Sequence, residues 1–540
     1  AGRPLTASNA LGKTTTTTYN DTGRSITVTD PLGHTLSTQF DAAGNTVSAT
    51  DPRGHTTSFT YDAANNRTSA TDALGATTSF SYDALNRLSS FTNARGKTTT
   101  STYDADGNRT AVTDPLNRSQ QAAYDLAGNL TATTDGKNQT TSYSYDVLNR
   151  VTQVTKPGNL TVAFTYDALG NTLTTVDARG TTTRTYDALG QLTAVTTPDI
   201  TTVAYAYNAT GARTQLTYPD TRTASSTYSD DGLLTSVTGS AGDTTLYSYR
   251  ADGSLLTTTL PNGITTSYTY DDAGRLASIS HAKGTTLLSV SYTRDENGNP
   301  TTIDDSLAGQ SSYSFDALDQ LTAEVRSGTT TTYTYDAVGN RLTKTVNGIT
   351  TASTYDDANQ LTAAGTTTFT YDANGSRVTR TQGGATTAYS YTSDNLLAGT
   401  SSSQLTTTNL YDGENQRIAA IESGTRTDFA LDEAAGNELV LTETTGSETT
   451  TLTYGLALIS RETSQGIRYL LADALGSVRL ETDASGQVVK EHTYEPFGSE
   501  LGTLDLTGNR FRFSGGHTEA SGLIFLRARV YDPESGTFLS

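Results

Sequence analysis

The 540-residue chain contains no cysteine, methionine or tryptophan. Without cysteine it can form neither a disulfide scaffold nor a thiolate zinc site. Charged residues make up only 17% of the chain and good helix formers are sparse, which excludes a helical bundle or a coiled coil. No stretch approaches about 18 consecutive apolar residues, so membrane insertion by this chain is not predicted. The lack of any methionine leads us to expect a processed product or a fragment.

Basic residues are also scarce. The chain has 36 Lys and Arg against 56 Asp and Glu, so its formal net charge is −20 and its sequence pI is near 4.6. Such a surface argues against nucleic acid or an anionic membrane as a partner. No phosphate-binding loop or nucleophile elbow is visible. The five histidines are scattered without ligand spacing, so we predict no metal site and no cofactor: His34, His55, His281, His492 and His517.

Threonine makes up roughly a fifth of the chain, and 30 tyrosines and 48 glycines accompany it. Threonine and tyrosine favour strands. An aromatic residue followed by Asp recurs at intervals of 21 residues, with one step of 20 before Tyr186. A fixed period of this length indicates a repeat array. The tyrosines that we single out as structural repeat aromatics are Tyr61, Tyr82, Tyr103, Tyr124, Tyr145, Tyr166, Tyr186, Tyr270 and Tyr335.

Each repeat contains two turn signals. One directly follows the aromatic residue, as in residues 83–87, and the other lies about ten residues later, as in residues 72–75. Asp at the start and Gly or Asn near the end are typical of tight turns. Two turns leave two strands of about six residues, so each repeat is predicted to be a β-hairpin. The prediction is an all-β chain of continuous antiparallel hairpins, wound into a spiral sheet, a hollow shell or a tube.

The strand that enters the first turn has one aromatic face, because pairs such as Phe80 and Tyr82 stand two residues apart. In the return strand, Leu173 and Val176 stand three apart, which predicts a β-bulge or an early turn. Rows of tyrosine could bind sugars by stacking, but core packing is the favoured interpretation. The repeated aspartates could bind Ca²⁺, although capping of turns is favoured.

The regularity of the repeats divides the chain into three parts. Residues 1–290 hold regular repeats, residues 291–450 hold irregular ones, and residues 451–540 differ in composition, with denser arginine and phenylalanine. We therefore predict a terminal core or cap over residues 451–540.

The repeat and the last part together resemble a known family. Units such as Tyr-Asp-Ala-Leu-Gly-Asn at residues 166–171 resemble YD repeats. The C-terminal stretch resembles the Rhs repeat-associated core in five segments: residues 494–498, 510–515, 522–527, 528–533 and 536–540. The chain is thus identified as a member of the YD-repeat or Rhs family, which includes bacterial Rhs toxins, the C components of insecticidal toxin complexes and teneurins.

The resemblance implies a hollow β-shell with the core closing one end. In the bacterial members it also implies self-cleavage by aspartates, which points here to Asp532 in Tyr531-Asp532-Pro533, supported by Arg529 or Arg527. The family's second Asp-Pro motif does not occur before Ser540, so we expect the cleavage site and the passenger to lie beyond this chain. The competing interpretation is that Asp532 only opens a turn.

These observations lead to one favoured function and one alternative. The favoured function is a non-enzymatic, secreted or surface-exposed container or scaffold for a C-terminal toxin passenger. The alternative is a structural or adhesive extracellular fibre in which neighbouring copies are the partners. Glycans on threonine clusters such as residues 14–18, or on sequons such as that at Asn108, are also compatible with the sequence.

Overall fold

The computed structural model describes every residue except 1–2, 200–201, 437–438, 503, 506 and 528, so Ala528 of the C-terminal motif lies outside the described residues. The described residues form 52 strands and one 3₁₀ helix, η1 (Phe513–Gly515), without any α-helix. The first 48 strands make one continuous sheet. The last four make a small second sheet: β49 (His517–Thr518), β50 (Ile524–Leu526), β51 (Arg529–Asp532) and β52 (Thr537–Phe538). The all-β prediction is confirmed.

The large sheet is a meander in which each strand pairs antiparallel with the next one along the chain. Strand β8 (Thr77–Tyr82), for example, lies between β7 (Arg67–Thr71) and β9 (Leu88–Thr92). The same pairing connects the first strand, β1 (Thr6–Ser8), to the last, β48 (Val488–Glu491). The predicted succession of hairpins is therefore the fold that the chain adopts.

Aspartate side chains close the turns by accepting backbone hydrogen bonds. The Asp72 carbonyl accepts a bond from the Gly75 N–H over 3.0 Å. Its carboxylate accepts further bonds from the N–H groups of Leu74 and Ala76, over 3.0 and 2.9 Å. Gly75 has a φ of +85°, the left-handed conformation that glycine adopts without strain. These contacts agree with the favoured interpretation that the repeated aspartates cap turns.

A β-bulge and a tyrosine hydroxyl mark almost every hairpin. Pairing shifts by one residue at the Tyr-Asp tyrosine, as between Thr165 and Tyr166, which leaves Leu173 as the extra residue. The bulge predicted from Leu173 and Val176 is thus present. In most hairpins the tyrosine hydroxyl donates to a carbonyl 14 or 15 residues earlier, on the preceding return strand, over 2.6 to 3.2 Å. The predicted repeat aromatics all make this bond: Tyr61, Tyr82, Tyr103, Tyr124, Tyr145, Tyr166, Tyr186, Tyr270 and Tyr335.

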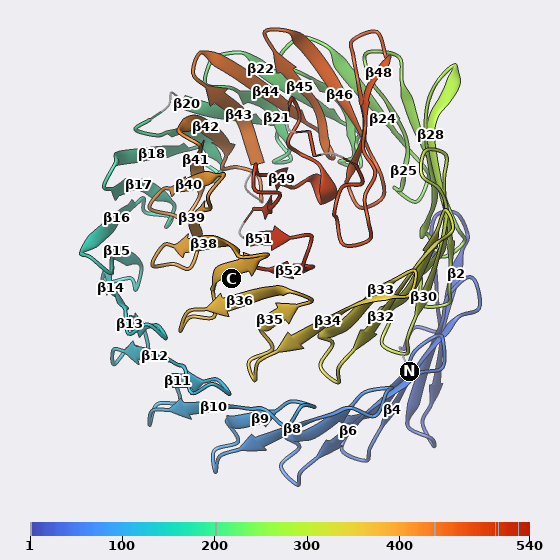
Figure 1. Cartoon of the computed structure of the whole chain (residues 1–540), viewed down its shortest axis with the longest axis vertical. Coiled ribbons are helices and arrows are strands. Elements are labelled where there is room, and N and C mark those ends of the chain that lie inside the picture. The colour runs from blue at the N-terminus through green and yellow to red at the C-terminus, as the bar shows by residue number, and fades with distance from the viewer. Residues whose placement is uncertain (1–2, 200–201, 437–438, 503, 506, 528) are drawn as a thin grey trace.

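The sheet winds around an axis and overlaps itself, as Figure 1 shows, where later orange strands lie beside earlier teal and green ones. Contacts between successive turns of this spiral join residues far apart in sequence. The separation is 266 residues for Arg53 and Asp319, 234 for Tyr218 and Leu452, and 174 for Arg479 and Asp305. The spiral therefore tightens toward the C-terminal end, and of the predicted arrangements it is the spiral that forms.

Basic side chains hold the first turn of the spiral against the second. Arg53 donates to the Asp316 carbonyl and to the Asp319 carboxylate, each over 2.9 Å. Arg95 repeats this pattern 42 residues later, with the Asp356 carbonyl at 2.9 Å and Asn359 at 2.7 Å. We call this line of contacts the seam.

A basic residue recurs at this turn position in every second hairpin. Lys137, a further 42 residues along, pairs with Asp372 over 3.3 Å. The hairpins in between carry leucine at the same turn position, and these leucines are exposed: Leu74 at 57% and Leu116 at 38%. The hairpin of Leu116 reaches the second turn of the spiral through a different residue, because Arg118 donates to Gln360 over 2.9 Å.

Turns at one edge of the sheet shorten where the spiral tightens. Two-residue turns such as Asn347-Gly348 connect β33 (Arg341–Val346) to β34 (Ile349–Tyr355). Both turn residues have positive φ, at +47° and +85°. Turns of this type match the right-handed twist of strands, which favours the stronger coiling of this part.

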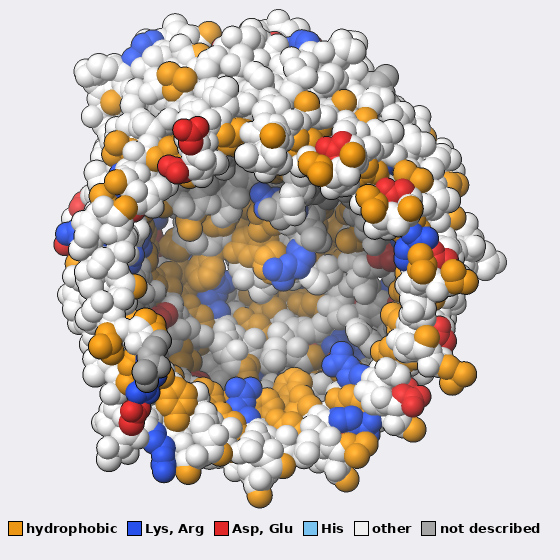
Figure 2. Space-filling view, turned by 180° about the vertical axis from the view of Figure 1, so that it is seen from behind, with side chains coloured by type: hydrophobic (Ala, Val, Ile, Leu, Met, Phe, Trp, Pro, Cys, Tyr) orange, Lys and Arg blue, Asp and Glu red, His pale blue; other side chains and the backbone are white. Residues whose placement is uncertain are grey.

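The aromatic face of the sheet points inward and the threonine face points outward. Cross-strand hydroxyl pairs such as Thr71 and Thr77, 2.8 Å apart, are exposed. Figure 2 shows a wide hollow lined by hydrophobic and basic side chains, whereas the outer wall is mostly polar. No described residue before Val162 is fully buried, because the wall there is a single layer. The hollow therefore presents half-exposed aromatic side chains.

We predict that Arg95→Leu weakens the seam, because the change removes hydrogen bonds to Asp356 and Asn359. The free energy of unfolding should fall by about 1–3 kcal/mol in urea titrations, as expected for hydrogen bonds from a charged group. Leu74→Ala alters the equivalent position of a neighbouring hairpin and should change stability by less than about 0.5 kcal/mol. Equal effects of the two changes would contradict a stabilising role of the seam.

Candidate functional site

The candidate site is the C-terminal segment that lies inside the spiral, together with the wall that holds it. We call residues 493–540 the plug. Figure 1 places its strands β51 and β52 within the ring of the large sheet. Phe497 packs against Tyr333 of the wall, with ring centroids 5.4 Å apart. The Tyr494 carbonyl accepts a hydrogen bond from Arg326 over 2.8 Å, so the plug is attached by both apolar and polar contacts.

Asp532 is a buried carboxylate of the plug with several hydrogen-bond partners. It is 5% exposed, and its Oδ2 accepts a bond from Arg377 Nη1 over 2.7 Å. The Ser535 hydroxyl donates to the same oxygen over 2.7 Å, and the Glu534 N–H donates to Oδ1 over 3.1 Å. Arg377 is fully buried and stacks on Phe369 at 4.5 Å. A buried charge pair with this many hydrogen bonds fixes the position of both partners.

The two predicted self-cleavage residues, Asp532 and Arg529, have different contact partners in the structure. Arg529 is exposed, and its guanidinium lies 3.8 Å from the centre of the Phe538 ring. Asp532 takes its charge partner from the wall instead, 155 residues earlier in the chain. The main chain of Asp532 also closes the turn of residues 532–536, where the Gly536 N–H donates to the Asp532 carbonyl over 2.8 Å. Asp532 therefore fills the turn-opening role as well.

A buried histidine forms a second charged contact between the plug and the wall. His517 Nδ1 lies 3.0 Å from Glu519 and Nε2 lies 3.1 Å from Glu443 of the wall. Arg417 of the wall pairs with Glu519 as well. Burial opposes the charged form of His517, but its bonds to Glu443 and Glu519 outweigh burial and raise its pKa above 6.5. Burial also opposes the charge on Glu519, yet Arg417 and His517 lower the pKa of that carboxyl below 4.5.

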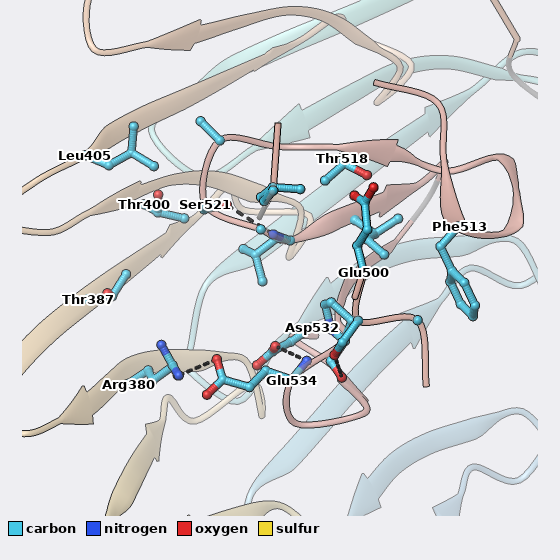
Figure 3. Close-up of a pocket in the computed structure, with 18 of the residues that line it drawn as sticks. Arg380, Thr387, Thr400, Leu405, Glu500, Phe513, Thr518, Ser521, Asp532 and Glu534 are labelled. Carbon is cyan, nitrogen blue, oxygen red and sulfur yellow. Dashed lines mark hydrogen bonds and ion pairs between the residues drawn. The ribbon is translucent and has the colours of Figure 1, made fainter. Parts of the chain in front are cut away.

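A cavity of about 500 Å³ lies between the plug and the second turn of the spiral. Figure 3 shows Glu500, Asp532 and Glu534 of the plug beside it, with Arg380 on the wall. Arg380 pairs with Glu534 over 2.6 Å at the edge of the cavity. The lining therefore combines acidic groups from the plug with a basic group from the wall.

Within the residues that the structure describes, no group of three or more acidic or histidine side chains is placed to hold a metal ion. Likewise, none of the described segments is a helix long and apolar enough to cross a membrane. The contacts that define the site are hydrogen bonds, ion pairs and stacked rings.

A wound, open β-shell with an internal C-terminal plug is the class of protein that this geometry defines. The chain matches the teneurin YD-shell family over residues 12–134, 58–179 and 283–540, and RHS repeats over residues 166–199, 186–223 and 251–286. These matches cover well over half of its length. The chain belongs to the YD-shell family, and the resemblance read from its repeats is confirmed.

The chain spans only a small part of the length of the curated relatives that it matches. The chain is 32% identical over 136 residues to tRNA3(Ser)-specific nuclease WapA of Bacillus spizizenii and to tRNA(Glu)-specific nuclease WapA of Bacillus subtilis subsp. natto. That region is 24% of this chain and 6% of each relative. A crystal structure of TcdB2–TccC3–Cdc42 is 17% identical, with a TM-score of 0.75, and the Photorhabdus luminescens Tc holotoxin pore has a TM-score of 0.66. The whole chain aligns with 32% of each of these structures, which supports the fold alone.

We predict that Arg377→Met releases the C-terminal part of the plug. Removing one partner of a buried ion pair leaves Asp532 buried and unpaired, which costs about 3–5 kcal/mol. Hydrogen exchange of residues 529–540 should accelerate strongly. Arg380→Met breaks a pair that is largely exposed on the Glu534 side and should cost less than about 1 kcal/mol. Unchanged exchange in Arg377→Met would show that this pair does not hold the plug.

We also predict that docking of the plug weakens both when the pH is raised and when it is lowered. The pKa of His517 is raised in the folded chain. The stabilisation that His517 gives to the docked plug is therefore complete below its ordinary pKa of 6.5, and it is lost as the pH rises through the raised pKa. Because the pKa of Glu519 is lowered, its contribution is complete above 4.5 and is lost as the pH falls.

Hydrogen exchange of residues 513–520, measured from pH 4 to pH 9 and corrected for intrinsic rates, should show the strongest protection between these limits. His517→Gln should remove the loss of protection on the alkaline side, whereas His34→Gln in an outer turn should leave it in place. Protection that stays constant across this pH range would contradict a contribution of His517 to docking.

Proposed function

We propose that the chain is the closing part of a container in which a C-terminal passenger, a toxin, is kept inside a β-shell. The observation that carries the proposal is the position of the plug on the inner, aromatic face of the sheet. Leu539 is 1% exposed and packs with Tyr389 and Leu397 of the wall. Its carbonyl accepts a bond from the Arg377 N–H over 2.9 Å. Any residues that follow Ser540 would begin on this inner side.

The surroundings of the plug suit such a role. The hollow in Figure 2 is open on one side and lined by half-exposed aromatic side chains. Large exposed apolar surfaces mark sites that bind other polypeptides or ligands. Figure 1, the view from the opposite side, shows the plug strands β51 and β52 within the ring of the large sheet. A toxin passenger and a secreted or surface location are supported by the similarity to Tc toxin structures and to the WapA nucleases.

Three narrower points stay predictions. Residues 451–540 are proposed to act as the cap of the shell. Self-cleavage through Asp532 with Arg529 is a further hypothesis, for which Asp532 lies beside a cavity whereas Arg529 lies on Phe538. The fibre built from neighbouring copies remains the alternative function, with glycans on threonine or asparagine as possible additions.

Imaging and proteolysis together test the container. Electron micrographs of the purified chain should show separate particles with a lumen, and long filaments would instead favour the fibre. A flexible protease site added after Ser540 should be cut several-fold more slowly than the same site added at the amino terminus, because the inner position limits access. Cutting at equal rates would contradict enclosure.

A further inference from the structure

Six arginines occupy one position of the repeat. Each is the first residue of a return strand, paired across the hairpin with the aromatic residue of the Tyr-Asp turn. Other repeats carry a residue such as leucine there, for example Leu88 opposite Tyr82. The six are Arg67, Arg109, Arg213, Arg341, Arg377 and Arg417.

The three arginines in the second turn of the spiral all bind the plug. Arg341 donates to the Ser535 carbonyl over 2.8 Å. Arg377 binds the Asp532 carboxylate, and Arg417 binds the Glu519 carboxylate. An arginine at this position therefore acts as a clamp for an acceptor group that lies inside the spiral.

An aromatic ring of the plug accompanies two of these arginines. Phe497 lies 4.6 Å from the Arg341 guanidinium, and Phe525 lies 3.8 Å from that of Arg417. Aromatic rings of the wall also lie near the same two guanidinium groups, at 5.8 and 4.9 Å. Stacking between rings holds a guanidinium flat and leaves its edge free to bind a carboxylate.

Among the first-turn arginines, Arg213 binds Asp432 across the seam over 2.5 Å. Arg67 and Arg109 are exposed, and their guanidinium groups make no hydrogen bond or ion pair with the described part of the chain. Arg67 lies over Phe80 at 4.7 Å and near Phe59 at 5.7 Å. Arg67 therefore lies beside aromatic rings, as the arginines that bind the plug do, but its guanidinium binds no acceptor group among the described residues.

The wall itself offers these two arginines no carboxylate. Strands β2 (Thr14–Asn20) to β26 (Thr265–Tyr270) contain a single acidic residue, Asp177, at the end of its strand. Almost all of the negative charge in this part of the chain therefore lies in the turns at the edges of the sheet. The strands around the hollow thus supply no carboxylate to Arg67 or Arg109, and a carboxylate brought by an enclosed segment would meet both guanidinium groups without an ion-pair partner.

We infer that Arg67 and Arg109 bind carboxylates of the enclosed polypeptide, in segments where Asp or Glu stands close to an aromatic residue. The inference rests on the container function proposed above and adds the chemistry of its contents. The plug provides the example, because Asp532 directly follows Tyr531 and binds a wall arginine at the same repeat position. The two arginines are 42 residues apart, so they lie two hairpins apart on one wall.

A peptide that copies residues 529–540, labelled with a fluorophore, tests this binding in trans. The plug of the full chain already occupies Arg341, Arg377 and Arg417, so Arg67 and Arg109 are the matching positions left for the peptide. Fluorescence anisotropy should show binding that weakens with added salt. Changing both residues, Arg67→Gln with Arg109→Gln, should raise Kd about ten-fold, as expected for loss of charge-assisted hydrogen bonds.

Two controls make the result specific. Arg24→Gln removes an arginine from an exposed turn outside this repeat position and should leave Kd unchanged. A peptide with Asp532 and Glu534 replaced by Asn and Gln should bind about ten-fold more weakly to the wild-type chain and be insensitive to the Arg67 and Arg109 changes. Equal binding of the acidic peptide to the wild-type chain and to the double variant, or no binding to either, would overturn the inference.

The test separates this inference from the container function. If imaging shows a lumen and the site after Ser540 is protected while the double variant still binds the peptide normally, only the inference fails. If micrographs show no lumen, the container itself fails, whatever the peptide does.

Discussion

The fold depends on one constraint, which is that a single-layered sheet with one apolar face has nothing else to cover that face. Soluble domains usually bury such a face against helices or a second sheet. The described part of this chain contains no α-helix, so the sheet can only cover its aromatic side by winding around itself. Where the spiral is wide, aromatics such as Phe59 stay half exposed. Where it is tight, Ile264 and Leu480 from different turns meet in one fully buried cluster.

Winding creates a second requirement, because the backbone ladder fixes neighbouring strands but not the alignment of one turn of the spiral with the next. The seam provides that alignment. Its basic side chains reach carbonyl and carboxylate oxygens of turns that lie far away in sequence, as Arg53 does with Asp316 and Asp319. Each contact is modest, but it recurs at regular intervals, and repeat proteins gain stability from such repeated interfaces.

Much of the local structure could be predicted from the sequence. The 21-residue period, the Asp-led turns and the spacing of Leu173 and Val176 depend on neighbours within one hairpin, and the hairpin contains the information needed. The direction and pitch of winding could not be predicted, because they depend on contacts more than 170 residues apart. One signal was nevertheless present: leucine and a basic residue alternate at one turn position, as in Leu74 and Arg95.

Prediction of the candidate site from the sequence is limited in the same way, because its contacts join distant parts of the chain. The motif predicts Asp532 as a site residue, and proximity in the sequence predicts Arg529 as its partner. In a strand, successive residues face opposite sides, and these two stand three positions apart, so their side chains leave β51 on different faces. The buried partner, Arg377, comes from a strand 155 residues earlier. A contact of this kind can be recognised only after the sheet has been wound.

A repeat fold also explains how the plug came to be held in this way. The first position of the return strand faces the inside of the spiral in every hairpin and usually carries a leucine or another residue that packs against its neighbours. Replacing that residue with arginine leaves the backbone unchanged, because the aromatic pair across the hairpin supports the guanidinium, as Phe369 supports Arg377. A single substitution thus converts a packing position into a carboxylate clamp. Hairpins in which the arginine has no partner, such as that of Arg67, present the clamp to the hollow instead of to the plug.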